Sequence, residues 1–405
     1  MAAQLLKFIS SLRLTVVCLA CALVLVFLGT MAQEPLGLYI VQKNYFQSTF
    51  VDWFSLKAGI QKALHLLKVD VIPISADEVL RAPWIPVFPG GYLIGWVLLI
   101  NLLAAHYVRF KFTWQKAGIF MTHVGLILLL LGQFFTEQLQ EESNLRLEEG
   151  EERNYSEDQR DAELVFIDPS NPDFDRVVAI PNAVLAKGRE ITHEALPFGI
   201  RVERYAQNSR LKNYNPESQD GAPAATRGIG ARASLSEIAP ATAMNELDVP
   251  SAVISFTGAN APEGTWLMSV NLDSPQEILA GGKTWKAEYR FTRHYTPYSI
   301  GLIDFRHDLY LGTEKPRNFS SQIRLTNAET GEDREVLIRM NEPLRYAGAT
   351  YFQASFDEKN PNVTILQVVR NPAWLTPYVA VIIVGAGLLV QFLMHLFKFA
   401  SRRKA

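Results

Sequence analysis

Three histidines lie within or beside long apolar runs, where an ionisable side chain is costly and is therefore a candidate for function. His106 and His395 each stand three residues before a basic residue, and His123 stands seven residues after Lys116. Since a helix rises about 1.5 Å per residue, all three imidazoles would lie in the half of a membrane that the basic residues flank. Neutral imidazole is a common metal ligand, so these three histidines are the candidate binding residues of the chain.

His123 is the deepest of the three, about 10 Å inside a helix that would run through MTHVGLILLLLGQFF. On a helical wheel it points about 140° away from a stripe of small residues that lets membrane helices approach closely. That stripe comprises Gly118, Thr122, Gly125, Leu129 and Gly132, whereas His123 shares its side with Phe120, Ile127, Leu130 and Phe134. An imidazole framed by apolar side chains suits axial ligation of haem iron. The alternative is a structural histidine that is hydrogen-bonded to a neighbouring helix.

For the other titratable groups, simpler interpretations are favoured. His106 and His395 would mark the water interface, where polar tips are tolerated. His294 and His307 each follow an arginine among aromatic residues, which suits a porphyrin with its propionates but also arises by chance in an aromatic-rich domain. His193 is a weaker candidate still. The CLAC sequence has the spacing of a thiol redox motif, but it lies inside an apolar run and is interpreted as packing.

Four apolar runs are each long enough to cross a bilayer, which takes roughly 20 residues in a helix. They lie at about 12–32, 92–108, 117–136 and 374–397. Basic residues without acidic companions flank the first run, the link between the second and third, and the end of the fourth. Because basic flanks of short loops stay cytoplasmic, both termini are predicted inside. A secretory signal peptide in place of the first span is the disfavoured alternative.

The predicted organisation follows from these spans. Residues 1–136 form the first part of the membrane domain, with an outer loop at 33–91. Residues 137–373 form an extracytoplasmic domain, in which acidic residues outnumber basic ones, and residues 374–405 carry the fourth span and a basic cytoplasmic tail. The fold class is thus an integral membrane protein with four transmembrane α-helices and a large β-rich domain inserted between helices 3 and 4.

Local patterns add detail outside the spans. Residues 48–67 show apolar positions at spacings of three and four, which predicts an amphipathic helix on the outer membrane surface. Its stripe comprises Trp53, Leu56, Ile60, Ala63, Leu64 and Leu67. Ile85–Gly91 (IPVFPGG) should then break the chain. In the outer domain, short alternating runs such as ELVFI, SAVISF and ATYFQASF predict strands that pack as a sandwich or an open barrel. Residues 213–232 lack apolar periodicity and are predicted to form a loose excursion from the domain, without regular structure.

The motif search excludes several classes and leaves one resemblance. The chain has no P-loop, HExxH, GxSxG or dinucleotide fingerprint, so it does not look like a self-contained enzyme. Several segments together resemble the ResB (CcsB, plastid Ccs) family of System II cytochrome c biogenesis proteins. They are SSLRLTVVCL, GLYIVQKNYF, IPVFPGGYLIG, NLLAAHYVRF, KAGIFMTHVGLILLLLGQ, EESNLRLEEGEERNYSE, KPRNFSSQIRL and IRMNEPLRYAGATYFQASF. Residues of about 160–285 contribute little to the resemblance.

The resemblance implies a non-autonomous subunit of a cytochrome c synthase (haem lyase) complex in the inner membrane. With a CcsA-type partner it would carry haem b outward, transiently and shared with the partner, and support its attachment to C-x-x-C-H of apocytochrome c. A histidine of the third span serves as a haem ligand in the family, and His123 matches it. A thiol-reducing partner is possible, and nothing points to nucleic acid. The alternatives are another transporter subunit and a membrane-anchored outer scaffold or sensor without haem.

Overall fold

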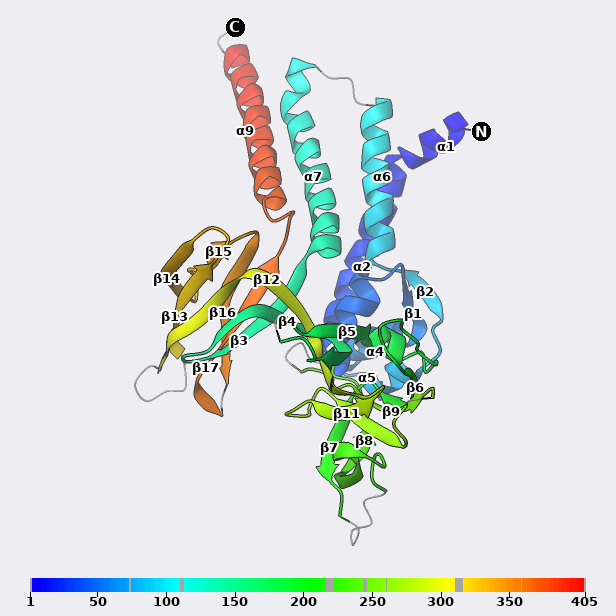
Figure 1. The fold of residues 1–405 in the computed structure, drawn as a ribbon. Helices are drawn as coiled ribbons and strands as arrows, with labels where there is room; N and C mark the ends of the chain where they lie inside the picture. The colour runs from blue at the N-terminus through cyan, green and yellow to red at the C-terminus, as the bar shows by residue number, and fades with distance from the viewer. Residues whose placement is uncertain are drawn as a thin grey trace. The chain divides into compact units, whose positions relative to one another are not determined.

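The computed structural model describes residues 2–72, 74–109, 113–172, 174–215, 222–242, 246–259, 261–309, 316–357 and 359–403. The chain divides into two compact units (Figure 1). The membrane unit comprises residues 1–140, 242–245 and 371–405, and the β unit comprises residues 141–241 and 246–370. The β unit therefore occurs in the chain between the third and fourth long helices.

Within the described residues, four helices of the membrane unit are long and apolar enough to cross a membrane. They are α2 (Leu12–Leu36), α6 (Gly91–Arg109), α7 (Ala117–Leu139) and α9 (Thr376–Arg403). The four apolar runs of the sequence are thus confirmed as long helices. A short helix, α1 (Ala2–Ile9), precedes α2, and the turn between them is tied to α6. The amide of Asn101 donates to the carbonyl oxygens of Ile9 and Ser11, at 2.5 and 3.1 Å.

The segment between α2 and α6 is more structured than predicted. It contains α3 (Leu38–Val41), the π-helical turn η1 (Gln42–Phe46), β1 (Phe50–Asp52), α4 (Trp53–Leu66), α5 (Ala76–Arg81) and β2 (Pro86–Pro89). The prediction of a helix over 48–67 was wrong in its first turn, because β1 pairs there with β2, inside the segment predicted only to break the chain. The carboxylate of Asp52 then caps α4 by accepting from the amides of Phe54 and Ser55.

The buried face of α4 also differs from the predicted stripe. Ser55, Leu56, Ala58 and Gly59 are buried, whereas Trp53 at one end of the stripe is 44% exposed. The small residues let α4 pack closely on α2: a Cβ atom added at Gly59 would lie 2.5 Å from the carbonyl oxygen of Leu28. Helix-to-helix packing, more than a membrane surface, therefore accounts for the pattern of this segment.

The regular structure of the β unit is almost entirely antiparallel strand, and the predicted runs ELVFI, SAVISF and ATYFQASF all lie in strands. Its ten-stranded sheet has the order β14-β13-β12-β4-β3-β17-β16-β15, with β11 on β12 and β5 on β4. The bounds are β3 (Glu141–Glu148), β4 (Glu152–Asp168), β5 (Arg176–Pro181), β11 (Gln276–Ala280), β12 (Lys283–Leu309), β13 (Pro316–Asn327), β14 (Glu332–Arg339), β15 (Leu344–Tyr346), β16 (Ala349–Asp357) and β17 (Asn360–Arg370). A three-stranded sheet and a two-stranded one complete the unit. They comprise β6 (Gly199–Ala206), β9 (Ser251–Thr257) and β10 (Thr265–Ser269), and β7 (Ser209–Asn213) and β8 (Ala233–Glu237).

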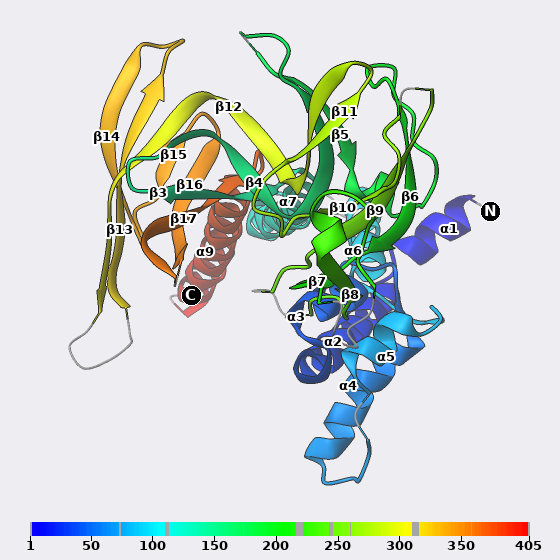
Figure 2. The same ribbon diagram turned by 60° about the horizontal axis from the view of Figure 1, so that its bottom comes forward.

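Among the described residues, the two larger hydrophobic cores of the β unit define two halves, and a smaller cluster lies between β8, β9 and β10. Figure 2 shows the strands of these halves as two groups that β4 and β12 join. In the first half, β4, β5, β11 and β12 pack face to face on the β10-β9-β6 sheet around a core that includes Phe166, Phe198 and Trp285. In the second half, all the core residues come from strands of one sheet, so that sheet must curl around them. The sequence predicted either a sandwich or an open barrel. The first half, with two packed sheets, is a sandwich, and the second half, with one curled sheet, is an open barrel.

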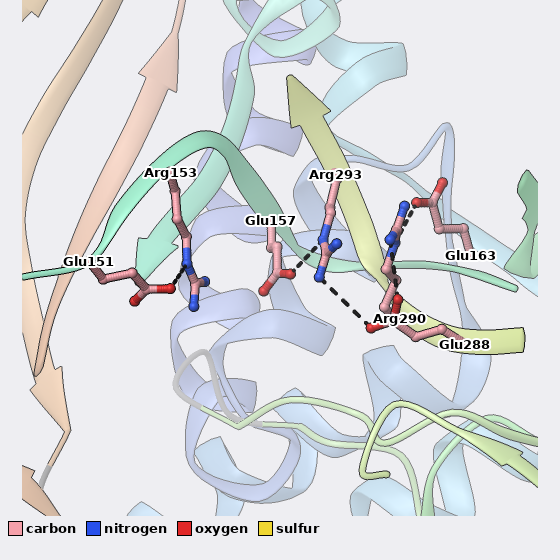
Figure 3. Close-up of polar contacts among 7 residues, drawn as sticks. All are labelled: Glu151, Arg153, Glu157, Glu163, Glu288, Arg290 and Arg293. Atoms are coloured by element: carbon pink, nitrogen blue, oxygen red, sulfur yellow. Dashed lines mark hydrogen bonds and ion pairs between the residues drawn. The ribbon is translucent and has the colours of Figure 1, made fainter. Parts of the chain in front are cut away.

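The long strands β4 and β12 run through both halves and carry ion pairs between the two cores (Figure 3). Their pairing shifts register between Phe291 and Arg293 and again between Tyr295 and Ile300. Arg290 is buried and donates to Glu163 and Glu288, both at 3.2 Å. This chain of charges satisfies the polar groups where the two strands leave one core and enter the other.

The excursion predicted over 213–232 is ordered in the part that the structure describes. Asn213 ends β7, and residues 228–232 form the 3₁₀ turn η3 that leads directly into β8. Gly228, at φ +59°, makes this turn, and the backbone amide of Ile229 donates to the side-chain carbonyl of Gln276 at 3.0 Å. Residues 216–221 lie outside the described residues. The second half of this connection is therefore anchored on β11.

Candidate haem site in the membrane unit

The helices α6 and α7 bring two of the three candidate histidines together. His106 lies near the end of α6 and His123 near the start of α7, and their ring centroids are 5.0 Å apart with a 59° angle between the ring planes. The ring of Phe120 lies 6.1 Å from that of His106, centroid to centroid. His106 thus lies beside His123, and the two imidazoles form one candidate site.

Both imidazoles are oriented by their own helices. Nδ1 of His123 lies 2.8 Å from the carbonyl oxygen of Ile119, and Nδ1 of His106 lies 3.3 Å from that of Leu102. Because a carbonyl oxygen only accepts, each of these hydrogen bonds requires a proton on Nδ1, which in a neutral ring leaves the lone pair on Nε2. A backbone carbonyl behind a histidine is the arrangement that orients metal-ligating histidines. In the neutral ring, Nε2 is thus the nitrogen able to ligate a metal.

The opposite face of α7 is taken by α9, which confirms the predicted role of the glycine stripe. Gly118, Gly125 and Gly132 are buried there. A Cβ atom at Gly118 would lie 2.5 Å from the carbonyl oxygen of Gly387, and one at Gly125 would lie 2.6 Å from a methyl group of Val384. The contact between α7 and α9 fixes the rotation of α7 about its axis. His123 is thereby held on the side of α7 that faces α6.

The third candidate, His395, does not join the pair among the contacts of the described residues. It lies on α9, exposed, with Nε2 2.8 Å from Nε2 of Gln391 in the preceding turn. Among the residues that the structure describes, no group of three or more His, Cys, Asp or Glu side chains is arranged to hold a metal ion.

The structure also places the other groups that the sequence singled out, which are three histidines and two cysteines. His307 stacks on Phe319, with ring centroids 4.4 Å apart, and also contacts Phe356. Nε2 of His294 lies 3.6 Å from the carboxylate of Asp158, and Nδ1 of His193 accepts from a backbone amide two residues on. Cys18 and Cys21 are free thiols on α2, and Cys18 is buried in the hydrophobic core of the membrane unit. None of these groups is joined to the His106–His123 pair by a described contact.

Comparison with known proteins gives one family match. Residues 263–365 match the model of the ResB-like family, a segment that runs from β10 into β17. No curated protein was found to match the chain. The match confirms the resemblance to the ResB family, and it suggests a role related to cytochrome c biogenesis. The four apolar helices fit a membrane protein.

Proposed function

Because residues 263–365 resemble the ResB-like family, we propose that this chain is the ResB-type subunit of a System II cytochrome c biogenesis complex. With a CcsA-type partner, it receives haem b in the inner half of the membrane and supports its transfer outward and attachment to apocytochrome c. Thiol reduction of the substrate falls to another protein. The observation that carries the proposal is the pair of oriented imidazoles at 5.0 Å between α6 and α7.

The geometry of the pair favours one axial ligand from this chain. An imidazole nitrogen lies about 2 Å from a metal it ligates, so two axial imidazoles on opposite faces of a porphyrin would have ring centroids roughly 6 Å apart or more. The observed 5.0 Å is too short to place a porphyrin between His106 and His123. His123 is therefore assigned as the axial ligand, and the second axial histidine comes from the partner chain.

His106 is assigned a positioning role beside the haem. It contacts the ring of His123 and so limits the directions in which that imidazole can turn, while the ring of Phe120 lies beside His106 itself. Lys116 directly precedes α7, seven residues or about two helical turns before His123. Its basic side chain suits the propionates of a haem whose polar edge faces inward. Haem supplies the iron and four pyrrole nitrogens when it is bound.

Replacing His123 by Gly in the co-expressed complex tests the ligand. The variant should assemble but lose most of its haem, measured as Soret absorbance per protein, and cytochrome c maturation should stop. Added imidazole should restore part of both, because it can fill the vacated coordination site. His106→Gly should lower haem content less, and the exposed His395→Gly serves as the control.

Two outcomes would overturn the assignment. An unchanged haem spectrum and normal maturation in His123→Gly would make His123 a structural residue. The absence of a Soret band from the purified wild-type complex would favour a scaffold or sensor without haem.

The proposed setting is the cytoplasmic membrane, with both termini inside and the β unit outside. Basic residues such as Lys7, Arg13, Lys116 and Lys398 support this orientation, since each lies at the same end of the predicted four-span topology. Reporter fusions at Ala405 and within residues 213–232 should report opposite compartments. Two fusions active in the same compartment would contradict the topology.

A further inference from the structure

A cavity of 310 Å³ lies in the membrane unit at the far end of α6 and α7 from the two histidines. The start of α6, the end of α7 and the π-turn η1 enclose it. Glu137 at its rim is fourteen residues beyond His123, or about 21 Å along α7. The cavity is therefore a separate site in the other half of the predicted membrane, and its ligand need not be the haem.

The cavity is built by glycines and by a rare turn. The backbone of Phe46, in the π-turn, lies directly against Gly91, where a Cβ atom would overlap its carbonyl oxygen. A Cβ atom at Gly95 would instead meet nothing within 4 Å, so the absent side chain leaves the space open. Trp96 and Phe134 form one wall of the cavity. Their rings contact each other edge to face, with centroids 4.8 Å apart. Single π-turns occur frequently at functional sites.

The lining is mainly apolar, and its polar part carries no positively charged side chain. The hydroxyl of Tyr92 donates to the carboxylate of Glu137 at 2.8 Å, and the amides of Gln42, Gln47 and Gln133 complete the polar part. Among the described residues that line the cavity, none is Lys, Arg or His. A carboxylate in a lining without Lys, Arg or His repels anions, which disfavours a phospholipid phosphate and the propionates of haem. A neutral ring that bears carbonyl or hydroxyl oxygens matches the amide donors and the carboxylate acceptor.

We propose that this cavity binds the head group of a membrane quinone or quinol. A planar ring fits against Trp96 and Phe134, glutamine amides donate to its oxygens, and Glu137 accepts from a quinol hydroxyl. Ligand pockets span about 300–1,000 Å³, and 310 Å³ suits one substituted ring better than a four-pyrrole macrocycle. The apolar residues Leu99 and Leu130 line the same cavity and suit the start of an isoprenoid tail.

The test uses the full chain, purified in detergent with its partner if one co-purifies. Decylubiquinone is titrated while tryptophan fluorescence is followed, and co-purified quinone is extracted and quantified per chain. Gly95→Leu should fill the cavity and weaken decylubiquinone binding at least tenfold. Gly385→Leu on α9 is the matched control, because a Cβ atom there also meets nothing within 4 Å. Glu137→Gln, which keeps the shape of the site, should weaken reduced decylubiquinol more than the oxidised form.

The results separate this site from the haem site. His123→Gly should leave decylubiquinone binding unchanged, so loss of haem in that variant cannot be mistaken for failure of the cavity. Equal binding by Gly95→Leu and Gly385→Leu would overturn the proposal. Displacement of decylubiquinone by phosphatidylglycerol vesicles at equal lipid concentration would also overturn it, since it would identify the cavity as a lipid site.

Discussion

Arg290 offers the sharpest test of how the two halves of the β unit are joined. Its side chain is 8% exposed, and its guanidinium reaches both Glu163 and Glu288 at 3.2 Å (Figure 3). Replacing Arg290 by Met keeps the length of the side chain and removes the charge. The two carboxylates, with side chains 13% and 24% exposed, would then remain where water solvates them poorly.

The size of the effect follows from burial. Removing one partner of a buried ion pair costs about 3–5 kcal/mol. Arg293 also reaches Glu288, at 3.8 Å, and keeps part of the compensation, so the lower end, about 3 kcal/mol, is expected. For a unit of this size that corresponds to a fall of roughly 6–12 °C in Tm. Arg306→Met, on the same strand, is the control because its pair with Asp304 is largely exposed and worth less than about 1 kcal/mol.

Thermal unfolding of the purified protein, followed by near-ultraviolet circular dichroism, measures both variants. Adding Glu163→Gln and Glu288→Gln to Arg290→Met should recover much of the loss, because the uncompensated charges are then gone. If Arg290→Met lowers Tm no more than Arg306→Met, or the triple variant is no more stable than the single one, the reasoning from buried charge is wrong.

Three further outcomes follow from local contacts. Gly125→Leu should separate α7 from α9 and cost about 1–3 kcal/mol as overpacking, seen as lost cross-linking between engineered cysteines on the two helices, whereas Gly385→Leu should keep it. Hydrogen bonds from Lys283 and a neighbouring serine lower the pKa of Asp168 to about 2, so its stabilisation is complete above about pH 4 and is lost as pH falls toward 2. Asp168→Asn should therefore flatten the acid-unfolding curve of the protein in that window. The Cys18→Ser, Cys21→Ser double variant should keep cytochrome c assembly, because neither thiol has the exposed, electropositive surroundings that activate a thiolate.

The long helices and the strands were predictable because their signals are local. An apolar run of about 20 residues already satisfies the requirement for a membrane helix, and alternation with turn residues identified the strands of the β unit. The pairing of β1 with β2 was not predictable, since its two strands are three and four residues long and lie on either side of two helices. The division of one sheet between two cores depends on register shifts in the pairing of β4 with β12, which no short sequence pattern predicts.

The sequence predicted how deep in the membrane the candidate histidines lie, but not which neighbouring helix each of them faces. Counting residues from the basic flanks placed His106 and His123 at similar depth, yet a helix that is apolar on every side carries no stripe to say which face meets which neighbour. On α7 the glycine stripe gave that information, and α9 occupies it. On α6 the spacing of Tyr92, Trp96, Leu99 and His106 along one face was the available signal, and it was missed.

The rotation of α7 links the packing of the membrane unit to its proposed chemistry. Gly118, Gly125 and Gly132 allow no side chain against α9, so α7 cannot turn about its axis without a clash with Gly387 or Val384. That constraint holds His123 toward α6, where His106 stands too close for a porphyrin to lie between the two rings. In the proposed complex, a haem bound to His123 would therefore lie on the open side of the pair, and a second ligand would come from the partner chain. The packing of α7 against α9 and the short distance between the two imidazoles are thus the reasons why we assign one ligand to this chain and the second to a partner.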